Sequence, residues 1–500
     1  MKKRINIFIL FVIFILAFLL RAQELISHNF LFLIDQGRDM MAVKSIIFDH
    51  HLTLIGPYTS LQGVFQGPLW YYLLSIPTFF LKGDPWGGIV LMFIISLSVV
   101  FISFFFTKKM FGEKAAIFTA FVFAISPEAI AAATYTWNPH PMWLLVILYI
   151  FIFYKALSKK YFHLFLWPII SLMFHFETAL AVFILFATII YFLIFERKKL
   201  FQKHFFYGVL IAGFFFLPQI IFDLRHNFLM TKSILSLFSG SKQGLLIKGE
   251  SQNYFLLIQN HLSLFSYNFQ TSFMRDGYLR FLPNIMFAIM IFSVFLNSKL
   301  SLFSQKENKF NLFLLKVVGI IVLLSFFYPF PLRYWFLTGF QSFYVLIFAL
   351  FLSRMWSGFK GRFFVSILIA VFVFYSGLKI HTLYFNPPDE GGTAKIKGKT
   401  EAIDYVYNDS KRKEFNLLVF TPPVNTDAYD YLIFWYGKEK YGFIPSSKKS
   451  GTFYLLIEPD PEKPWSYKGW LETVIKDGKV LETKTLPSGF IIQKRITDEK

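Results

Sequence analysis

Two acids and one arginine lie within a five-residue stretch near the N-terminus of the chain. Asp35, Arg38 and Asp39 stand among Leu, Phe, Ile and Met residues, where an ionised carboxylate costs free energy unless water, a partner or a substrate compensates its charge. If residues 37–47 form a helix, the two acids project from one face of it. We predict that Asp35 and Asp39 are catalytic and that one of them is a general base, although the sequence does not decide which. An ordinary interface role is the alternative.

Polar residues in the turns between apolar runs are candidates for substrate binding. Asn138 and His140 alternate with prolines, which hold a turn, and His175 and Glu177 lie in a second tight turn. Amide and imidazole groups can donate hydrogen bonds to a sugar hydroxyl or a phosphate. The predicted substrate-binding residues are Arg38, Gln66, Asn138, His140, His175 and Glu177. A purely structural turn and a His175–Glu177 hydrogen bond are the alternatives.

Three cationic side chains near the ends of later apolar runs are candidates for binding a phosphate. Arg225 and His226 end a run that contains Pro218, and Arg333 follows a Pro-Phe-Pro sequence. Arginine presents a planar fork of donors that suits a phosphate, and histidine can add a further donor. The alternatives are a self-contained pair of Asp223 with Arg225 and membrane anchoring by Arg333.

The composition indicates the scaffold that must position these residues. Apolar residues make up 55% of the chain and phenylalanine alone supplies 69 of its 500 residues, in runs long enough to cross a bilayer. Almost all of the net charge of +20 lies before residue 385, in short basic loops, so it indicates the cytoplasmic side of a membrane protein and argues against nucleic-acid binding. The absence of cysteine excludes disulfides and thiolate metal sites.

The apolar runs predict an all-α polytopic membrane protein with about eleven transmembrane helices. The N-terminus is expected in the cytoplasm and the C-terminus outside, since the lysine-rich loops then share one side. Residues 68–82 are too short to span comfortably and are predicted to lie at the outer leaflet. The predicted spans are 1–20, 86–106, 115–134, 141–157, 162–175, 177–195, 205–222, 281–296, 311–328, 338–353 and 363–380.

We expect a transmembrane domain over residues 1–384, with a first outer loop at 23–85, and a small extracytoplasmic α/β domain over 385–500. The second domain follows a linker rich in Pro and Gly, and its length allows a core of its own. Its predicted elements are the linker 386–392, helices 399–408 and 427–436, strands 415–420 and 452–458, and a hairpin over 479–495.

Residues 5–380 resemble the GT-C superfamily of membrane glycosyltransferases, in particular the aminoarabinose transferases of lipid A and the protein O-mannosyltransferases. The resemblance is carried by Asp35-Gln36-Gly37-Arg38-Asp39 in the first outer loop, by Gly67-Pro68-Leu69-Trp70-Tyr71-Tyr72, and by Asn138-Pro139. In this chain Gln36 replaces a common Glu, Asn138 replaces a common Asp, and Gly67 stands where aminoarabinose enzymes have a lysine. The resemblance implies a polyprenyl-phosphate-linked sugar donor and inversion at the anomeric carbon.

The resulting hypothesis is an enzyme of the plasma (inner) membrane that transfers a sugar from a polyprenyl-phosphate donor to an extracytoplasmic glycan, lipid or protein. The partners are membrane lipid, this donor and the acceptor, and a divalent metal is possible but has no support in the sequence. The alternatives are a transporter or flippase and a lipid-linked glycan polymerase or ligase. Most ionisable residues lie at helix ends and no paired repeat is present, which favours the transferase over a transporter.

Overall fold

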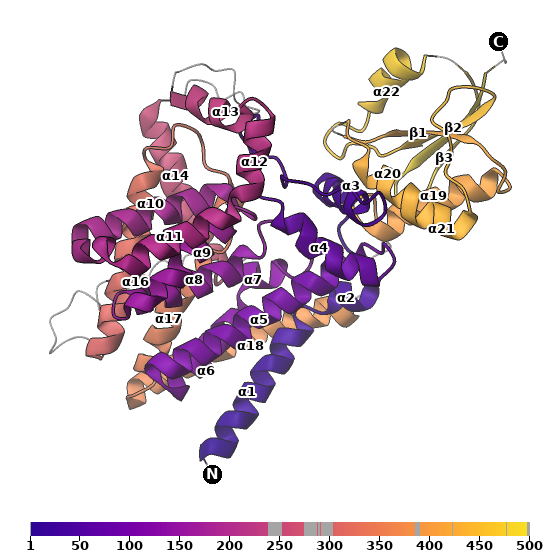
Figure 1. Cartoon of the computed structure of the whole chain (residues 1–500). Coiled ribbons are helices and arrows are strands. Elements are labelled where there is room, and N and C mark those ends of the chain that lie inside the picture. Colours follow the sequence, from indigo (N-terminus) through magenta and orange to yellow (C-terminus); the bar gives the residue numbers. More distant parts are fainter. Residues whose placement is uncertain are drawn as a thin grey trace.

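The computed structural model describes a helical bundle joined to a small domain with one sheet (Figure 1). The described residues are 2–238, 253–274, 288, 291, 304–385, 391–422, 424–476 and 478–497. Most of the predicted span 281–296 and most of the predicted linker 386–392 lie outside these residues. The predicted class, a mostly helical membrane protein with a small C-terminal α/β part, is confirmed, whereas the division at residue 385 stays a prediction.

The N-terminal part consists of one long helix followed by the helices of the first outer loop. These are α1 (Lys2–Leu19), α2 (Gln23–Ser27), α3 (Ile34–Ile47) and α4 (Leu69–Phe80). The fully buried Arg21 fastens the end of α1 to the bundle, because its guanidinium donates to Ser96 Oγ (2.8 Å) and to the carbonyl oxygens of Phe123 (2.9 Å) and Ala124 (2.7 Å). α4 has 12 residues and is about 18 Å long, which is too short to cross a bilayer, as expected for residues 68–82.

The bundle is built from long apolar helices and several shorter ones. Among the described residues, four helices (α5, α10, α16 and α18) are long and apolar enough to cross a membrane, and the pair α11 and α12 would make a fifth span. Shorter apolar helices include α1, α4, α8 and α17, so the predicted count of about eleven stays a prediction. The bundle elements are α5 (Trp86–Phe111), α6 (Glu113–Ile125), α7 (Pro127–Ala131), α8 (Met142–Ala156), η1 (Lys160–Phe162), α9 (His163–Met173), α10 (Thr178–Phe195), η2 (Arg197–Phe201), α11 (Lys203–Phe215), α12 (Leu217–Arg225), α13 (Leu229–Phe238), α14 (Tyr254–Thr271), α16 (Gln305–Ser325), η4 (Tyr334–Leu337), α17 (Gln341–Met355) and α18 (Phe359–Phe385).

Two of the predicted spans are interrupted, and proline explains both breaks. The predicted span 115–134 divides into α6 and α7 at Ser126, and Pro127 is the first residue of α7. The predicted span 205–222 divides into α11 and α12, which meet at an angle of 53°, and Pro218 lies in the first turn of α12. Proline has no N–H to donate to the preceding turn, so it is tolerated where a new helix begins. Helix α14 was not predicted.

The C-terminal part is a four-stranded sheet with helices packed against it. The strand order is β1-β2-β4-β3, with β1 parallel to β2 and both pairs that include β4 antiparallel. β2 is almost entirely buried, as expected of a central strand, and the predicted helices, strands and hairpin are present. The elements are α19 (Ile396–Asp409), β1 (Asn416–Phe420), α20 (Asp427–Leu432), the π-helical η5 (Ile433–Gly437), α21 (Lys438–Tyr441), β2 (Thr452–Ile457), α22 (Tyr467–Trp470), the π-helical η6 (Leu471–Ile475), β3 (Lys479–Thr485) and β4 (Ile491–Ile496).

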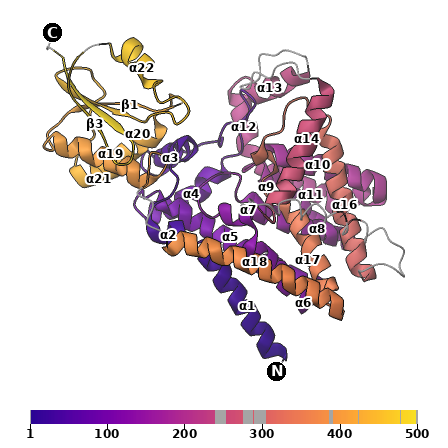
Figure 2. The ribbon, with the colours of Figure 1, turned by 180° about the vertical axis from the view of Figure 1, so that it is seen from behind.

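The first outer loop lies between the two parts of the molecule. Figures 1 and 2 show α3 beside α4 on one side and beside the sheet domain on the other. Backbone hydrogen bonds join the loop to the start of the sheet domain, from Phe32 N to Ala394 O (3.0 Å) and from Ile396 N to Phe30 O (3.0 Å). Helix α3 itself contacts α4 of the membrane part and α20 of the sheet domain.

Candidate active site

The predicted acid cluster is assembled on the first turns of α3. The side chain of Gln36 accepts a hydrogen bond from Leu33 N (2.9 Å), which satisfies one free backbone donor at the start of the helix. Arg38 donates through Nη1 to Asp35 Oδ1 (2.8 Å) and through Nε and Nη2 to Asp39 Oδ1 (2.9 and 2.7 Å). The arginine therefore holds both predicted catalytic acids at once.

Two tryptophans complete the cluster from neighbouring elements. Trp70 of α4 donates its indole N–H to Asp39 Oδ2 (2.7 Å), and Trp137 from the turn before α8 donates to Asp35 Oδ2 (3.0 Å). The sequence analysis did not assign these roles. Tryptophan is common at membrane interfaces without any such bond, so the sequence alone does not show which indole N–H donates to which acid.

The two acids differ sharply in their surroundings. The Asp39 side chain is fully buried, whereas 40% of the Asp35 side chain is exposed. Burial raises the pKa of Asp39 to about 6, and the charge of Arg38 and the Trp70 hydrogen bond oppose this rise. Asp35 is thus the acid that an incoming molecule can reach.

Gln66 and Asn138, both predicted to bind substrate, are bonded to each other. Asn138 Nδ2 donates to Gln66 Oε1 (2.9 Å) and to the carbonyl oxygen of Phe176 (2.8 Å), and both side chains are buried. A further bond, from Gln36 Nε2 to Thr136 O (2.6 Å), ties α3 to the same turn. The two turns predicted from the sequence and the first outer loop therefore meet in one place.

His175 and Glu177 are close in sequence but do not form the hydrogen bond considered as an alternative. Leu69 N donates to His175 Nδ1 (3.3 Å), and His175 Nε2 bonds to Phe215 O (3.0 Å), at the break between α11 and α12. Glu177 caps α10 by accepting from Ala179 N (3.0 Å). Burial raises the pKa of Glu177 to about 8, opposed by that hydrogen bond.

His140 lies in a group of aromatic rings that we call the aromatic cluster. Its Nδ1 bonds to Tyr135 O (3.0 Å), and burial lowers its pKa to about 3. The cluster consists of Tyr135, Trp137, His140, Tyr334 and Trp335, with ring centroids 4.5 to 6.3 Å apart. Trp137 belongs both to this cluster and to the acid site.

The structure separates the predicted phosphate-binding cations. Arg333 adjoins the aromatic cluster, with its guanidinium 6.0 Å from the Trp335 ring centroid, and its Nε is buried without a hydrogen-bond partner among the described residues. Arg225 and His226 are exposed at the end of α12, where His226 stacks on Phe222.

The alternative considered for Arg225, a self-contained pair with Asp223, is not what the structure shows. Asp223 accepts instead from Met230 N (2.6 Å) and Thr231 Oγ1 (2.5 Å), at the start of α13. Within the described part of the chain, no three His, Asp or Glu side chains are grouped so that they could hold a metal ion.

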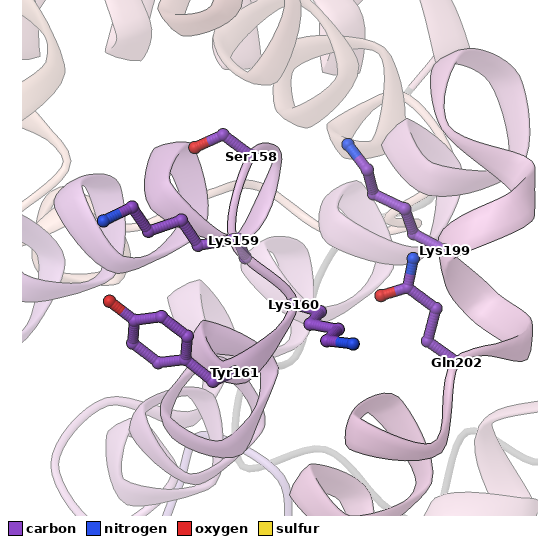
Figure 3. Close-up of a pocket in the computed structure, with 7 residues that line it drawn as sticks. Ser158, Lys159, Lys160, Tyr161, Lys199 and Gln202 are labelled. Carbon is purple, nitrogen blue, oxygen red and sulfur yellow. The ribbon is translucent and has the colours of Figure 1, made fainter.

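A separate surface cavity of about 410 Å³ lies at the other ends of α8 and α10 (Figure 3). α8 has 15 residues and α10 has 18, so this cavity is about 22 to 27 Å along the bundle from the acid site. Its lining residues are Ala156, Ser158, Lys159, Lys160, Tyr161, Lys199 and Gln202. Basic groups at one end of these helices and the acid cluster at the other agree with the charge asymmetry predicted from the sequence.

Comparison with known proteins identifies a family over part of the chain. Residues 66–222, about a third of the sequence, match the family described as dolichyl-phosphate-mannose-protein mannosyltransferase. This segment contains α4, both predicted turns and the bend between α11 and α12. No curated protein matches the chain in sequence.

Among solved structures, the chain is similar to ArnT from Cupriavidus metallidurans bound to undecaprenyl phosphate, with 10% identity, a TM-score of 0.49, and coverage of 98% of this chain and 97% of that one. It is also similar to the oligosaccharyltransferase of Archaeoglobus fulgidus, with 12% identity, a TM-score of 0.49, and coverage of 97% and 72%. Because both TM-scores lie below 0.5, the family match carries the assignment. The match over residues 66–222 supports the predicted class of enzyme, a membrane glycosyltransferase with a polyprenyl-phosphate-linked sugar donor.

Proposed function

We propose that the protein transfers a sugar from a polyprenyl-phosphate donor to a hydroxyl group of an extracytoplasmic glycan, lipid or protein, with inversion at the anomeric carbon. The observation that carries this proposal is the reachable carboxylate of Asp35, held by Arg38 and Trp137 beside a segment that matches the family. The family description names dolichyl-phosphate mannose, a sugar linked through phosphate to a long isoprenoid lipid, which is the same chemical class as the proposed donor.

Asp35 acts as the general base in this proposal. Each of its oxygens accepts one hydrogen bond, from Arg38 or from Trp137, and each has a second lone pair free to accept a proton or a hydroxyl group. Asp39 is fully buried and all its bonds go to Arg38 and Trp70, so it positions Arg38 and does not touch the acceptor. This divides between the two acids the roles that the sequence left open.

The reaction is a single displacement. The acceptor oxygen attacks the anomeric carbon, its proton passes to the Asp35 carboxylate, and the bond from that carbon to the phosphate oxygen breaks with its electron pair on the phosphate. Base catalysis of this kind contributes about 10²- to 10⁴-fold. The departing phosphate gains negative charge, which a nearby cation stabilises.

Arg333 is the first candidate for that cation. Its buried Nε lacks a partner, and its neighbours Tyr334 and Trp335 contact Trp137, which holds Asp35. Arg225 and His226 are exposed and lie on another helix, so we assign them a weaker, outer contact with the lipid phosphate.

The remaining predicted substrate-binding residues have a supporting role in this proposal. The polar atoms of Gln66, Asn138 and His175 form hydrogen bonds that join the first outer loop to the two turns. This favours a positioning role for these residues over direct contact with the sugar. Glu177 and His140 are also buried. No cofactor beyond the lipid-linked donor is assigned.

We propose the plasma membrane as the location, with the N-terminus in the cytoplasm and the sheet domain outside. The lysine-lined cavity then faces the cytoplasm and the acid site faces the outer leaflet, where a lipid-linked donor would arrive.

The experiment is an assay of the purified protein with a panel of prenyl-phosphate sugars, following prenyl-phosphate release and the glycosylated product by mass spectrometry. Asp35→Asn should abolish transfer, and Asp49→Asn, on the same loop but exposed and paired with Lys44, should retain it. Equal activity in the two variants would remove Asp35 from the mechanism. Lipid-linked sugars and envelope glycans from cells with and without the gene would identify the sugar and the acceptor.

A further inference from the structure

Helix α3 touches the sheet domain through a backbone contact that only glycine allows. A Cβ atom on Gly37 would lie 2.3 Å from Ala428 N and 2.4 Å from Ala428 Cα, closer than real Cβ atoms approach. Both partner atoms belong to the backbone of α20, so they cannot move aside as a flexible side chain would. Gly37 lies between Asp35 and Arg38 in the sequence, so the contact is made in the middle of the acid cluster.

Helix α20 is in turn held firmly on its other side. Tyr429, the residue after Ala428, donates to Glu458 at the end of β2, and Lys399 of α19 donates to Tyr429 Oη (2.9 Å) and to Glu458 Oε2 (3.0 Å). Tyr429 and Lys399 are both buried. Buried networks that are fully bonded fix the elements they join, so α20 has little freedom to move relative to the sheet.

Further contacts extend this interface along the first outer loop. Tyr431 of α20 donates to the carbonyl oxygen of Gly83, just before α5 (2.5 Å). Phe434 packs against Phe48, which follows α3, with ring centroids 5.3 Å apart, and the Lys44 ammonium lies 4.8 Å from the Phe434 ring centroid. The sheet domain therefore contacts the start, the middle and the end of the segment that carries the acids.

On its opposite side, α3 is fixed to the membrane domain by the bonds already described, from Trp70 to Asp39 and from Gln36 to Thr136. The helix thus lies between the bundle and the sheet domain (Figures 1 and 2). A displacement of either body would shift the carboxylates relative to the bundle.

We propose that the C-terminal domain is a positioning element of the active site, which sets the place of Asp35 and Arg38 through the contact of Gly37 with Ala428, braced by Tyr429. This inference rests on the proposed function and adds to it a role for the sheet domain. Correct placement matters because a shift of about 1 Å in a reacting group can reduce the rate about 100-fold.

The first test compares Gly37→Ala with Gly208→Ala. Gly208 of α11 makes an equally close contact, since a Cβ there would lie 2.1 Å from His163 O, but it is remote from the acids. Gly37→Ala should lower kcat about 100-fold per folded molecule, with a much smaller change in KM for the lipid donor. Gly208→Ala should lose activity only in proportion to lost folded protein. Equal kcat per folded molecule in both variants would overturn the proposal.

The second test compares Tyr429→Phe with Tyr436→Phe, and it decides the question if Gly37→Ala does not fold. Both changes remove one hydroxyl group from the sheet domain, but Tyr436 bonds to Asp404 (2.9 Å), away from α3. Tyr429→Phe should lower kcat and speed amide hydrogen exchange in residues 34–47, while Tyr436→Phe should do neither. Unchanged exchange in residues 34–47 of Tyr429→Phe would overturn the proposal. If Tyr429→Phe speeds exchange in residues 34–47 but the wild-type protein transfers no sugar, the positioning contact stands and only the proposed function is contradicted.

Discussion

Replacing Asp35 by asparagine should abolish catalysis while leaving the fold almost intact. The neutral amide cannot accept the proton of the acceptor hydroxyl, so the contribution of a general base, about 10²- to 10⁴-fold, is lost. That factor corresponds to about 3 to 5 kcal/mol of activation free energy. The stability change should be small, because the ion pair with Arg38 is partly exposed and such pairs contribute about 1 kcal/mol or less.

Asp39→Asn should behave differently although it also removes one carboxylate from the same helix. Asp39 is fully buried, and its two oxygens accept from Arg38 and Trp70. Asparagine places an N–H₂ group, which cannot accept, against one of these donors, and a buried donor left without an acceptor costs about 1 to 3 kcal/mol. We therefore expect a lower apparent melting temperature together with a loss of activity. The two variants separate the chemical role of one acid from the positioning role of the other.

The measurements are the initial rate of prenyl-phosphate release and the melting temperature of the detergent-purified protein, with Asp49→Asn as control. The control should match the wild type in both. If Asp35→Asn keeps more than about a tenth of the wild-type rate, Asp35 is not the base, because even the weakest base catalysis exceeds that factor. If Asp35→Asn lowers the melting temperature as much as Asp39→Asn does, the difference in burial does not control stability as argued.

Three further predictions concern pH and the neighbouring groups. Because burial raises the folded pKa of Asp39 to about 6, its contribution to stability is fully present below its ordinary pKa of 3.8 and is lost as pH rises through 6. Activity needs the ionised carboxylate of Asp39, which holds Arg38 in place, so kcat should fall as pH drops below about 6. A pH profile of kcat without this fall would contradict the positioning role of Asp39. Asn138→Asp removes the donor to two acceptors and should destabilise the protein by about 1 to 3 kcal/mol, seen in thermal melts; an unchanged melt would contradict the bonding. Arg333→Lys should reduce turnover more than Arg225→Lys, because lysine lacks the planar fork, and the reverse order would exchange their roles.

Periodicity and charge predicted most of the elements, because membrane helices and a small sheet leave clear local patterns. The apolar runs gave α5, α8, α9, α10, α16 and α17 with small errors at their ends. The breaks at Pro127 and Pro218 were missed although both prolines were visible. A proline near the middle of an apolar run fits a kinked span as well as two helices, and only packing decides between them.

The site was predicted in part because its residues are rare in their surroundings. Charged and polar groups in an apolar chain stand out, so Asp35, Arg38 and Asp39 could be found without any contacts. Their partners Trp70 and Trp137 could not, since indole groups are common at membrane interfaces and their bonds depend on long-range contacts. The close approach of Gly37 to Ala428 likewise joins positions far apart in the sequence, and no local pattern indicates it.

The bend between α11 and α12 determines the state of a ring in another segment. In an unbroken helix the Phe215 carbonyl would accept from the amide four residues later; as the last residue of α11, its oxygen is free to take the hydrogen of His175 Nε2. Leu69 N already donates to the other ring nitrogen, so the imidazole is fixed as the neutral tautomer protonated at Nε2. Burial lowers the pKa of His175 and so favours this neutral form, whereas its hydrogen bonds to the backbone of Phe215 and Gly67 oppose the shift. The break between α11 and α12 therefore keeps His175 out of proton transfer. The imidazole instead joins the end of α11 to the start of α4 through its bonds to Phe215 O and Leu69 N.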